Sequence, residues 1–143
     1  TLEGVQVQEL IDTDRGVETI AGSNRDPGFG PLLLFGLGGV FVEILEDTSL
    51  RVAPISEREG TAMTEEIKTA SLLSGARGTD PVDRDALVEV LCRLSQLVTE
   101  FPAITELDIN PLVALPPGEG VVAVDLRLSV DVDALSAPAE LDG

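Results

Sequence analysis

Alternating apolar and polar positions predict strands in the first part of the chain. Val5 and Val7 alternate with Gln6 and Gln8, so residues 4–10 are predicted to form a strand. Further apolar runs, bounded by glycine, proline and acidic residues, predict strands at residues 16–26, 31–36, 39–45 and 49–55. The last two runs flank a short polar turn and are expected to be the arms of a hairpin.

The spacing of apolar positions changes to three and four residues in the middle of the chain, which indicates helices. Residues 61–74 are predicted to form one helix, with Met63 and Ile67 on its apolar side. A clearer helix is predicted over residues 83–101, with either Asp80 or Asp83 as its N-cap. Its apolar positions are Leu87, Leu91, Leu94, Val98 and Phe101.

Two further strands are predicted at residues 103–115 and 120–130, on either side of a Pro-Pro-Gly-Glu-Gly turn. Five strands, two helices and a final strand pair predict an α+β fold, in which helices pack on a largely antiparallel sheet. Residues 131–143 are expected to be a C-terminal tail.

Length and charge limit the classes of function. The chain has 143 residues, of which 43% are hydrophobic, and this is enough for one domain with a core. Its 26 acidic and 9 basic residues give a net charge of −17. Such a surface repels nucleic acid and anionic membranes, so neither is an expected partner. The acids are spread along the chain, which favours a halophilic, solvated surface over a patch for a basic partner.

Several catalytic chemistries are excluded by composition. The chain has no histidine and one cysteine, Cys92, so it holds no internal disulfide, no histidine-based triad and no histidine or multi-thiolate metal site. Any bound metal is therefore expected to be a hard cation held by oxygen. The most apolar stretch, residues 31–45, is too short and too rich in glycine to cross a bilayer, and we expect a cytoplasmic protein.

Oxygen-bearing side chains interrupt the apolar pattern of the last predicted hairpin. Asp108 and Asn110 share one face of their strand, because side chains alternate between faces. A turn at residues 116–119 then sets Asn110 opposite Asp125 and Asp108 opposite Arg127.

Two interpretations of this hairpin stay open on spacing alone. Two carboxylates and an amide oxygen suit a magnesium ion that also binds substrate phosphates. Alternatively, Asp108 and Arg127 form a cross-strand ion pair, and Asn110 begins a turn before Pro111.

Other segments have both a structural and a ligand-binding interpretation. The strand edge at Gln8 and Glu9 could offer backbone groups to an adenine ring, with Glu18 near a ribose, or it is an ordinary amphipathic strand. The glycines at residues 36–39 fit neither a dinucleotide-binding nor a phosphate-loop motif and indicate a turn. Arg25 could hold an anion or pair with its neighbouring aspartate.

Two motifs together resemble a known family. They are R-D-P-x-F-G-P-x-x-x-F-G-x-G-G, starting at Arg25, and L-D-I-N-P-L, starting at Leu107 and followed by V-D. Both are similar to the ATP-grasp domain of ADP-forming acyl-CoA synthetases, which are relatives of succinyl-CoA synthetase. The resemblance covers residues 1–130 and implies the C-terminal lobe of that domain.

The resemblance implies a reaction and a set of binding residues. The reaction interconverts acyl-CoA, ADP and phosphate with a carboxylic acid, CoA and ATP, through an acyl phosphate and a phosphohistidine. Carried over, the family's sites fall on Gln8, Glu9 and Leu10 for adenine, on Glu18 for ribose, and on Asn110 and Asp125, with Asp108 beside them, for Mg²⁺.

The same resemblance implies partners, because parts of the enzyme are missing here. With no histidine in the chain, the phosphohistidine must come from a CoA-binding domain or subunit, and no catalytic residue is expected within this chain. The phosphate-holding lysines are expected in the remaining ATP-grasp lobe. The piece alone is therefore expected to be inactive and to bind ATP or ADP weakly. The alternatives are the ATP-grasp-like part of a protein lysine acetyltransferase, or a non-catalytic interaction domain.

Overall fold

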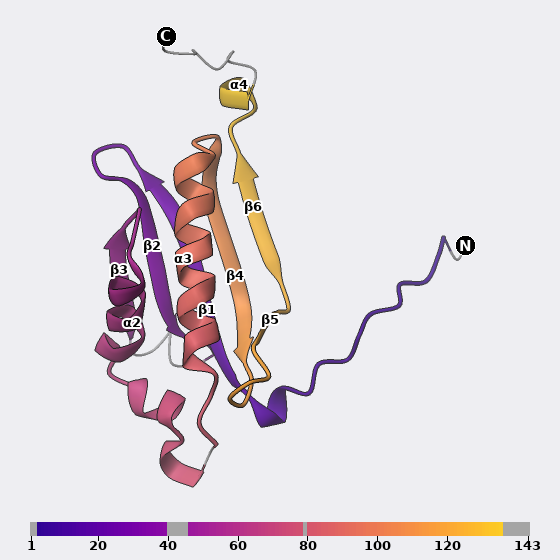
Figure 1. Cartoon of the computed structure of the whole chain (residues 1–143). Coiled ribbons are helices and arrows are strands. Elements are labelled where there is room, and N and C mark those ends of the chain that lie inside the picture. The colour runs from indigo at the N-terminus through magenta and orange to yellow at the C-terminus, as the bar shows by residue number, and fades with distance from the viewer. Residues whose placement is uncertain (1–2, 40–45, 79, 136–143) are drawn as a thin grey trace.

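A single β-sheet forms the centre of the computed structural model. The structure describes residues 3–39, 46–78 and 80–135. The strands follow the order β3-β2-β1-β4-β5, and β6 pairs with the same strand, β4, as β5 does (Figure 1). All strand pairs are antiparallel. The elements are η1 Thr13–Arg15, β1 Val17–Asp26, β2 Gly30–Leu37, β3 Thr48–Val52, α2 Glu57–Glu66, η2 Ala70–Ser74, η3 Ala76–Gly78, α3 Arg84–Glu100, β4 Ile104–Ala114, β5 Val121–Ala123, β6 Leu126–Val130 and α4 Val132–Leu135. The prediction of an α+β fold with a largely antiparallel sheet is confirmed.

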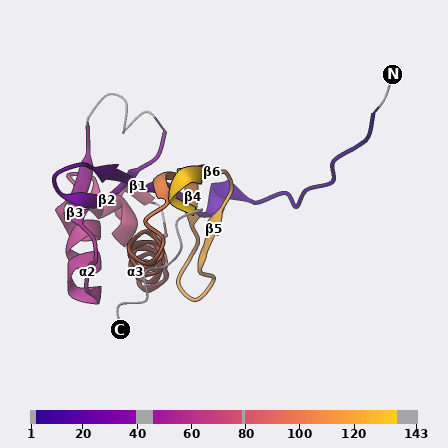
Figure 2. The same cartoon turned by 90° about the horizontal axis from the view of Figure 1, so that it is seen from above.

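Helices α2 and α3 lie on the same face of the sheet, and no described helix covers the other face (Figure 2). The covered face carries the core. Ala21 of β1 sits between Phe35 of β2 and Ile109 of β4, and all three are buried. Helix α3 adds the buried residues Leu87, Leu91, Leu94 and Val98, which are four of its five predicted apolar positions. Phe101, the fifth, is exposed.

The strands predicted at residues 16–26 and 31–36 are confirmed as β1 and β2. The strand predicted at residues 4–10 is wrong for this structure: the segment is extended and unpaired, and Leu10 is 95% exposed. Figure 1 shows it leaving the fold beside β5. A strand needs a hydrogen-bonding neighbour, and the described chain provides none for this segment.

Part of the predicted hairpin between residues 39–45 and 49–55 lies outside the described residues. Its second arm forms β3, and this strand pairs with β2, with Leu34 opposite Leu50. The last predicted strand is split, because residues 124 and 125 separate β5 from β6.

Helix α3 is confirmed, and Asp83 is its cap, since the Asp83 carboxylate accepts a hydrogen bond from the Ala86 backbone N–H at 3.1 Å. The helix predicted at residues 61–74 is wrong in its bounds. It begins at Glu57, because the Ser56 hydroxyl and the Glu59 carboxylate form a capping box that the apolar spacing does not reveal. It ends before Ile67, whose backbone is extended, and a separate 3₁₀ helix follows. Among the described helices, none is long and apolar enough to cross a membrane.

Asp47, which precedes β3, forms hydrogen bonds with the residues that follow α2. Its buried carboxylate accepts hydrogen bonds from the backbone N–H groups of Lys68, at 2.6 Å, and Thr69, at 2.8 Å, and from the Thr69 hydroxyl. Burial alone raises the pKa of this carboxyl, but the hydrogen bonds outweigh burial and hold the pKa below its usual value.

Replacing Asp47 with Asn tests this contact. A folded-state pKa below the unfolded one stabilises the protein above about pH 4, and this contribution is lost as the pH falls through the folded pKa. We expect Asp47→Asn to lower the free energy of unfolding at pH 7 by about 1–3 kcal/mol. The difference from the unmodified chain should shrink below pH 4 in urea titrations run at several pH values. A difference that does not change with pH would contradict the account.

Candidate functional site

The hairpin of β4 with β5 and β6 has the register that the sequence predicts. Asp108 is paired with Arg127. The backbone N–H of Asn110 donates to the carbonyl of Asp125 at 3.1 Å, which continues the same register between β5 and β6. The two predicted cross-strand pairs are therefore confirmed.

A β-bulge in β4 explains the unusual Asn-Pro sequence. Between the pairs Thr19–Leu112 and Ala21–Ile109, β1 has one residue, whereas β4 has two, Asn110 and Pro111. A proline fits here, because a bulge interrupts the regular ladder in which a strand residue would donate its N–H. The bulge lets both Ile109 and Leu112 reach the core, although they are three residues apart.

Thr19 holds the bulge from the neighbouring strand. Its hydroxyl donates to the carbonyl oxygen of Leu112 at 2.6 Å, and the Thr19 side chain is fully buried. A buried carbonyl without a partner costs free energy, so this hydroxyl stabilises the backbone at Leu112, where the bulge ends.

The polar side chains of the hairpin lie on the sheet face that no described helix covers. Ile109 belongs to the core under α3, and side chains alternate along a strand, so Asp108 and Asn110 face the opposite way. Asp108 is half-buried at the edge of a shallow hollow of about 230 Å³, whose floor includes Leu34 and Leu50. Asn110 and Asp125 are exposed.

The ion-pair interpretation of this hairpin is wrong in the structure. Within the described part of the chain, Asp108 and Arg127 are paired in register but form no ion pair within 4.0 Å. Nor does a turn begin at Asn110, because β4 continues through Pro111. The carboxylates of Asp108 and Asp125 therefore have no hydrogen-bonding or ionic partner among the described residues.

This donor set fits a hard cation. Carboxylate and amide oxygens are the ligands that Mg²⁺ accepts, and the ion usually keeps waters and adds substrate phosphates. No group of three or more acidic, cysteine or histidine side chains in the described residues could hold a metal. Asp108, Asp125 and the Asn110 amide are too few to surround an ion alone, and a cation bound here would need further oxygens from water or a ligand.

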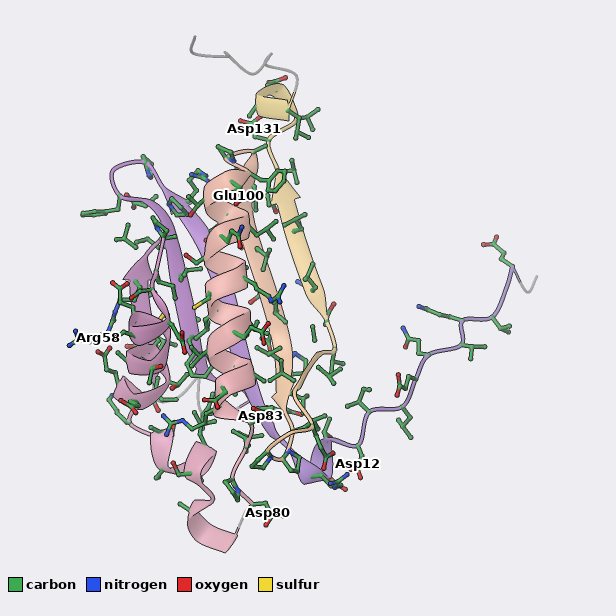
Figure 3. The ribbon with its side chains drawn as sticks, in the orientation of Figure 1. Asp12, Arg58, Asp80, Asp83, Glu100 and Asp131 are labelled. Carbon is green, nitrogen blue, oxygen red and sulfur yellow. The ribbon has the colours of Figure 1, made fainter. Side chains whose placement is uncertain are left out.

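Asp83 joins this hairpin to helix α3. Besides capping the helix, its carboxylate accepts hydrogen bonds from the N–H groups of Gly118, at 2.9 Å, and Gly120, at 3.1 Å. The hydrogen bond from the Ala86 N–H has the largest effect on the pKa of Asp83 and outweighs burial, which raises the pKa. The weaker effects of Gly118 and Gly120 add to it, so the pKa lies below its usual value. Figure 3 shows Asp83 at the end of α3 that meets the turn between β4 and β5. Sequence reasoning found the cap but not this second role, because no local motif signals it.

The other predicted site residues belong to the N-terminal segment and to β1, where Glu18 is paired with Val113 of β4. Gln8, Glu9 and Leu10 are exposed in the unpaired N-terminal segment. Glu18 is exposed on β1, and its carbonyl accepts the Gly38 N–H at 2.7 Å. A Cβ at Gly38 would lie 3.1 Å from that of Glu18, so a glycine is needed for this close approach.

Arg25 has a structural role in the described fold. Its guanidinium donates to the carbonyls of Val98, at 2.6 Å, and Ile104, at 3.3 Å, and so ties the C-terminal end of α3 to the start of β4. It forms no ion pair with Asp26 within the described chain; the Asp26 carboxylate instead accepts the N–H groups of Gly28 and Phe29.

Comparisons with known proteins agree on one family. The family model described as an ATP-grasp domain matches residues 1–130. Acetate–CoA ligase (ADP-forming) I of Archaeoglobus fulgidus is 44% identical over 131 residues, which are 92% of this chain and 19% of that protein. The beta subunit of acetate–CoA ligase (ADP-forming) I of Pyrococcus furiosus is 45% identical over 127 residues, which are 89% of this chain and 53% of that protein.

A solved structure shares the fold. It is the dinucleotide-forming acetyl-coenzyme A synthetase 1 of Ca. Korarchaeum cryptofilum, in complex with coenzyme A and Mg-AMPPCP, with a phosphohistidine segment that points towards the nucleotide-binding site. The match has a TM-score of 0.77 and 46% identity over 81% of this chain and 54% of that one. The chain therefore spans between a fifth and about half of the length of these relatives.

Replacing Thr19 with Val tests whether its hydroxyl supports the bulge. The variant keeps the shape of the side chain and leaves the buried Leu112 carbonyl without this donor, so we expect a loss of about 1–3 kcal/mol in the free energy of unfolding. Thr61→Val is the control, because that hydroxyl is exposed and donates only to Glu57 within its own helix. Equal stabilities of the two variants in urea titrations would refute the role of Thr19.

Proposed function

The chain belongs to the ATP-grasp family, and on that basis we propose that residues 1–130 are the C-terminal, nucleotide-binding lobe of an ADP-forming acyl-CoA synthetase. Residues 131–143 are its tail. The parent enzyme is an acid–CoA ligase, which interconverts acyl-CoA, ADP and phosphate with the acid, CoA and ATP. Similarity over about nine-tenths of the chain to two acetate–CoA ligases is the observation that supports this most.

Within that enzyme, we assign Mg²⁺ to Asn110, Asp125 and Asp108. The supporting observations are their shared register on the uncovered sheet face and the lack of partners for both carboxylates among the described residues. When bound, the ion neutralises charge on the nucleotide phosphates. The chain itself positions the ligands, because the bulge and the turn fix the backbone that carries their side chains. Ligands held in place need no reorganisation during the reaction.

Nucleotide binding needs parts beyond this hairpin. We assign the adenine to the backbone at Gln8, Glu9 and Leu10, and the ribose to Glu18. The first three lie in a segment that is unpaired here, so this contact depends on the remaining ATP-grasp lobe. Mg-AMPPCP in the Korarchaeum structure supports a magnesium–nucleotide ligand for this lobe.

The reaction also needs a second partner. This chain contains no histidine, so the phosphohistidine must be supplied by a CoA-binding domain or subunit. The net charge of −17, spread along the sequence, supports a halophilic surface for the same enzyme.

Substitutions in the parent enzyme test the metal assignment. Asn110→Ala and Asp125→Asn each remove one ligand, and charge stabilisation by a metal contributes several kcal/mol to the transition state. Since each 1.36 kcal/mol is a factor of ten in rate, we expect kcat/KM to fall by about 10²-fold or more. The assay is ATP formation from ADP, phosphate and acetyl-CoA over a range of Mg²⁺ concentrations.

Ser129→Ala is the matched control, because Ser129 is an exposed residue of β6 two positions beyond Arg127 and its hydroxyl has no assigned role. It should leave both activity and the Mg²⁺ requirement unchanged. Full activity in Asn110→Ala and Asp125→Asn would refute the metal site. A parent enzyme that forms no ATP from any acyl-CoA in a panel of short acids would refute the proposed reaction.

A further inference from the structure

Strand β6 carries apolar side chains on the helix side of the sheet that nothing in the described chain covers. Leu128 is paired with Leu107 and Leu126 with Ile109, so the members of each pair project from the same face. Leu107 and Ile109 are 3% and 7% exposed, whereas Leu128 and Leu126 are 48% and 52% exposed. The difference arises because a helix covers β4, whereas no helix among the described residues covers β6.

Helix α3 continues this apolar surface. Successive residues of a helix are about 100° apart, which puts Val90, Leu97 and Phe101 on one side of α3. The opposite side, at Val88 and Cys92, faces α2, where a Cβ on Gly60 would lie 3.1 Å from the Val88 side chain. Leu97 and Phe101 are exposed and Val90 is half-buried.

We call the combined surface the β6 strip, formed by Val90, Leu97, Phe101, Leu126, Leu128 and Val130. It lies on the side of α3 away from α2, along the strand at the edge of the sheet (Figures 1 and 3).

The spacing of elements indicates what would cover the strip. Strands lie about 4.8 Å apart and packed helices about 8–10 Å apart, so each helix covers about two strands. Helix α2 packs on β3 and β2, and α3 packs on β1, β2 and β4. The next position in this row, one helix spacing beyond α3, lies over β6 and has no described helix.

We propose that an amphipathic helix from the part of the parent polypeptide outside this chain packs on the β6 strip, alongside α3. The proposal rests on the proposed function, in which this chain is one lobe of a longer protein. The chain spans only 53% of the Pyrococcus subunit and 54% of the Korarchaeum chain, so about as much polypeptide again is available to provide the helix.

Acidic residues next to the strip indicate the charge expected at one end of that helix. Glu100 ends α3 and Asp131 follows β6, and both flank the corner where the Asp131 N–H donates to the carbonyl of Ala103 at 2.8 Å. Leu126–Val130 itself contains Arg127 and no acid. The docked helix therefore has an apolar face and basic side chains at the end that approaches Glu100 and Asp131.

Cysteine labelling tests whether the strip is covered. Leu128→Cys and Ser129→Cys, on opposite faces of β6, are each made in a Cys92→Ala background, both in this chain alone and in the parent enzyme stripped of its other cysteines. We expect a maleimide dye to label Leu128→Cys in the parent at least about tenfold more slowly than in the chain alone. A factor of ten corresponds to about 1.4 kcal/mol for exposing the side chain at position 128. Ser129→Cys reports labelling on the other face of the same strand.

A photo-crosslinking residue at position 128 of the parent identifies what covers the strip. A crosslink to a peptide outside this chain, with apolar residues at helical spacing, is the expected result. Equal labelling rates of Leu128→Cys in the two proteins would overturn the proposal, and so would a crosslink to a second copy of this chain or to a separate subunit.

These outcomes are distinct from a failure of the proposed function. A parent that protects position 128 but has no ligase activity would refute the function and leave the helix in place. An active parent in which position 128 is as reactive as in the chain alone would refute the helix only.

Discussion

The register of the β4 hairpin is the constraint on which the candidate site depends. Its side chains alternate between a packed and an uncovered face, so a slip by one residue would bury Asp108 and expose Leu107. Three contacts at different points hold the register: the apolar pairs under α3, the Thr19 hydroxyl at the bulge, and the Asp83 carboxylate at the turn. Only the first of these is hydrophobic. The two polar contacts specify which backbone groups meet, which apolar packing alone does not.

The bulge reconciles two demands on one strand. The core needs both Ile109 and Leu112, and the uncovered face needs Asp108 and Asn110, but strict alternation cannot place all four. One additional residue in β4 relative to β1 resolves the conflict, and Pro111 occupies a place where a donor is not required. The irregular motif therefore gives a regular result, because Leu107, Ile109 and Leu112 face the helices while Asp108 and Asn110 face away.

Much of this arrangement follows from sequence because it is set by local pattern. The four-residue spacing from Leu87 to Val98 identifies α3, and a hairpin joined by a short turn fixes which residues of β4 and β6 are opposite each other. Two of the failures have a common cause, which is dependence on partners distant in the chain. Residues 4–10 have the pattern of a strand but no neighbour, and the second role of Asp83 joins residues 35 and 37 positions apart. The start of α2 was missed for a different reason, since its capping box was a readable local signal that lay outside the apolar spacing.

The contacts of the turn also have a consequence for motion. Asp83 ties the turn to α3, and Arg15 reaches the same turn through an ion pair with Glu119 at 2.6 Å. The helix, the hairpin that carries the candidate ligands and η1 are thus connected at one end of the sheet. Residues 3–11, by contrast, belong to no described helix or strand, so a change in the direction of this segment leaves these contacts intact. The arrangement of the carboxylates can therefore stay constant while their distance from the exposed Gln8, Glu9 and Leu10 changes.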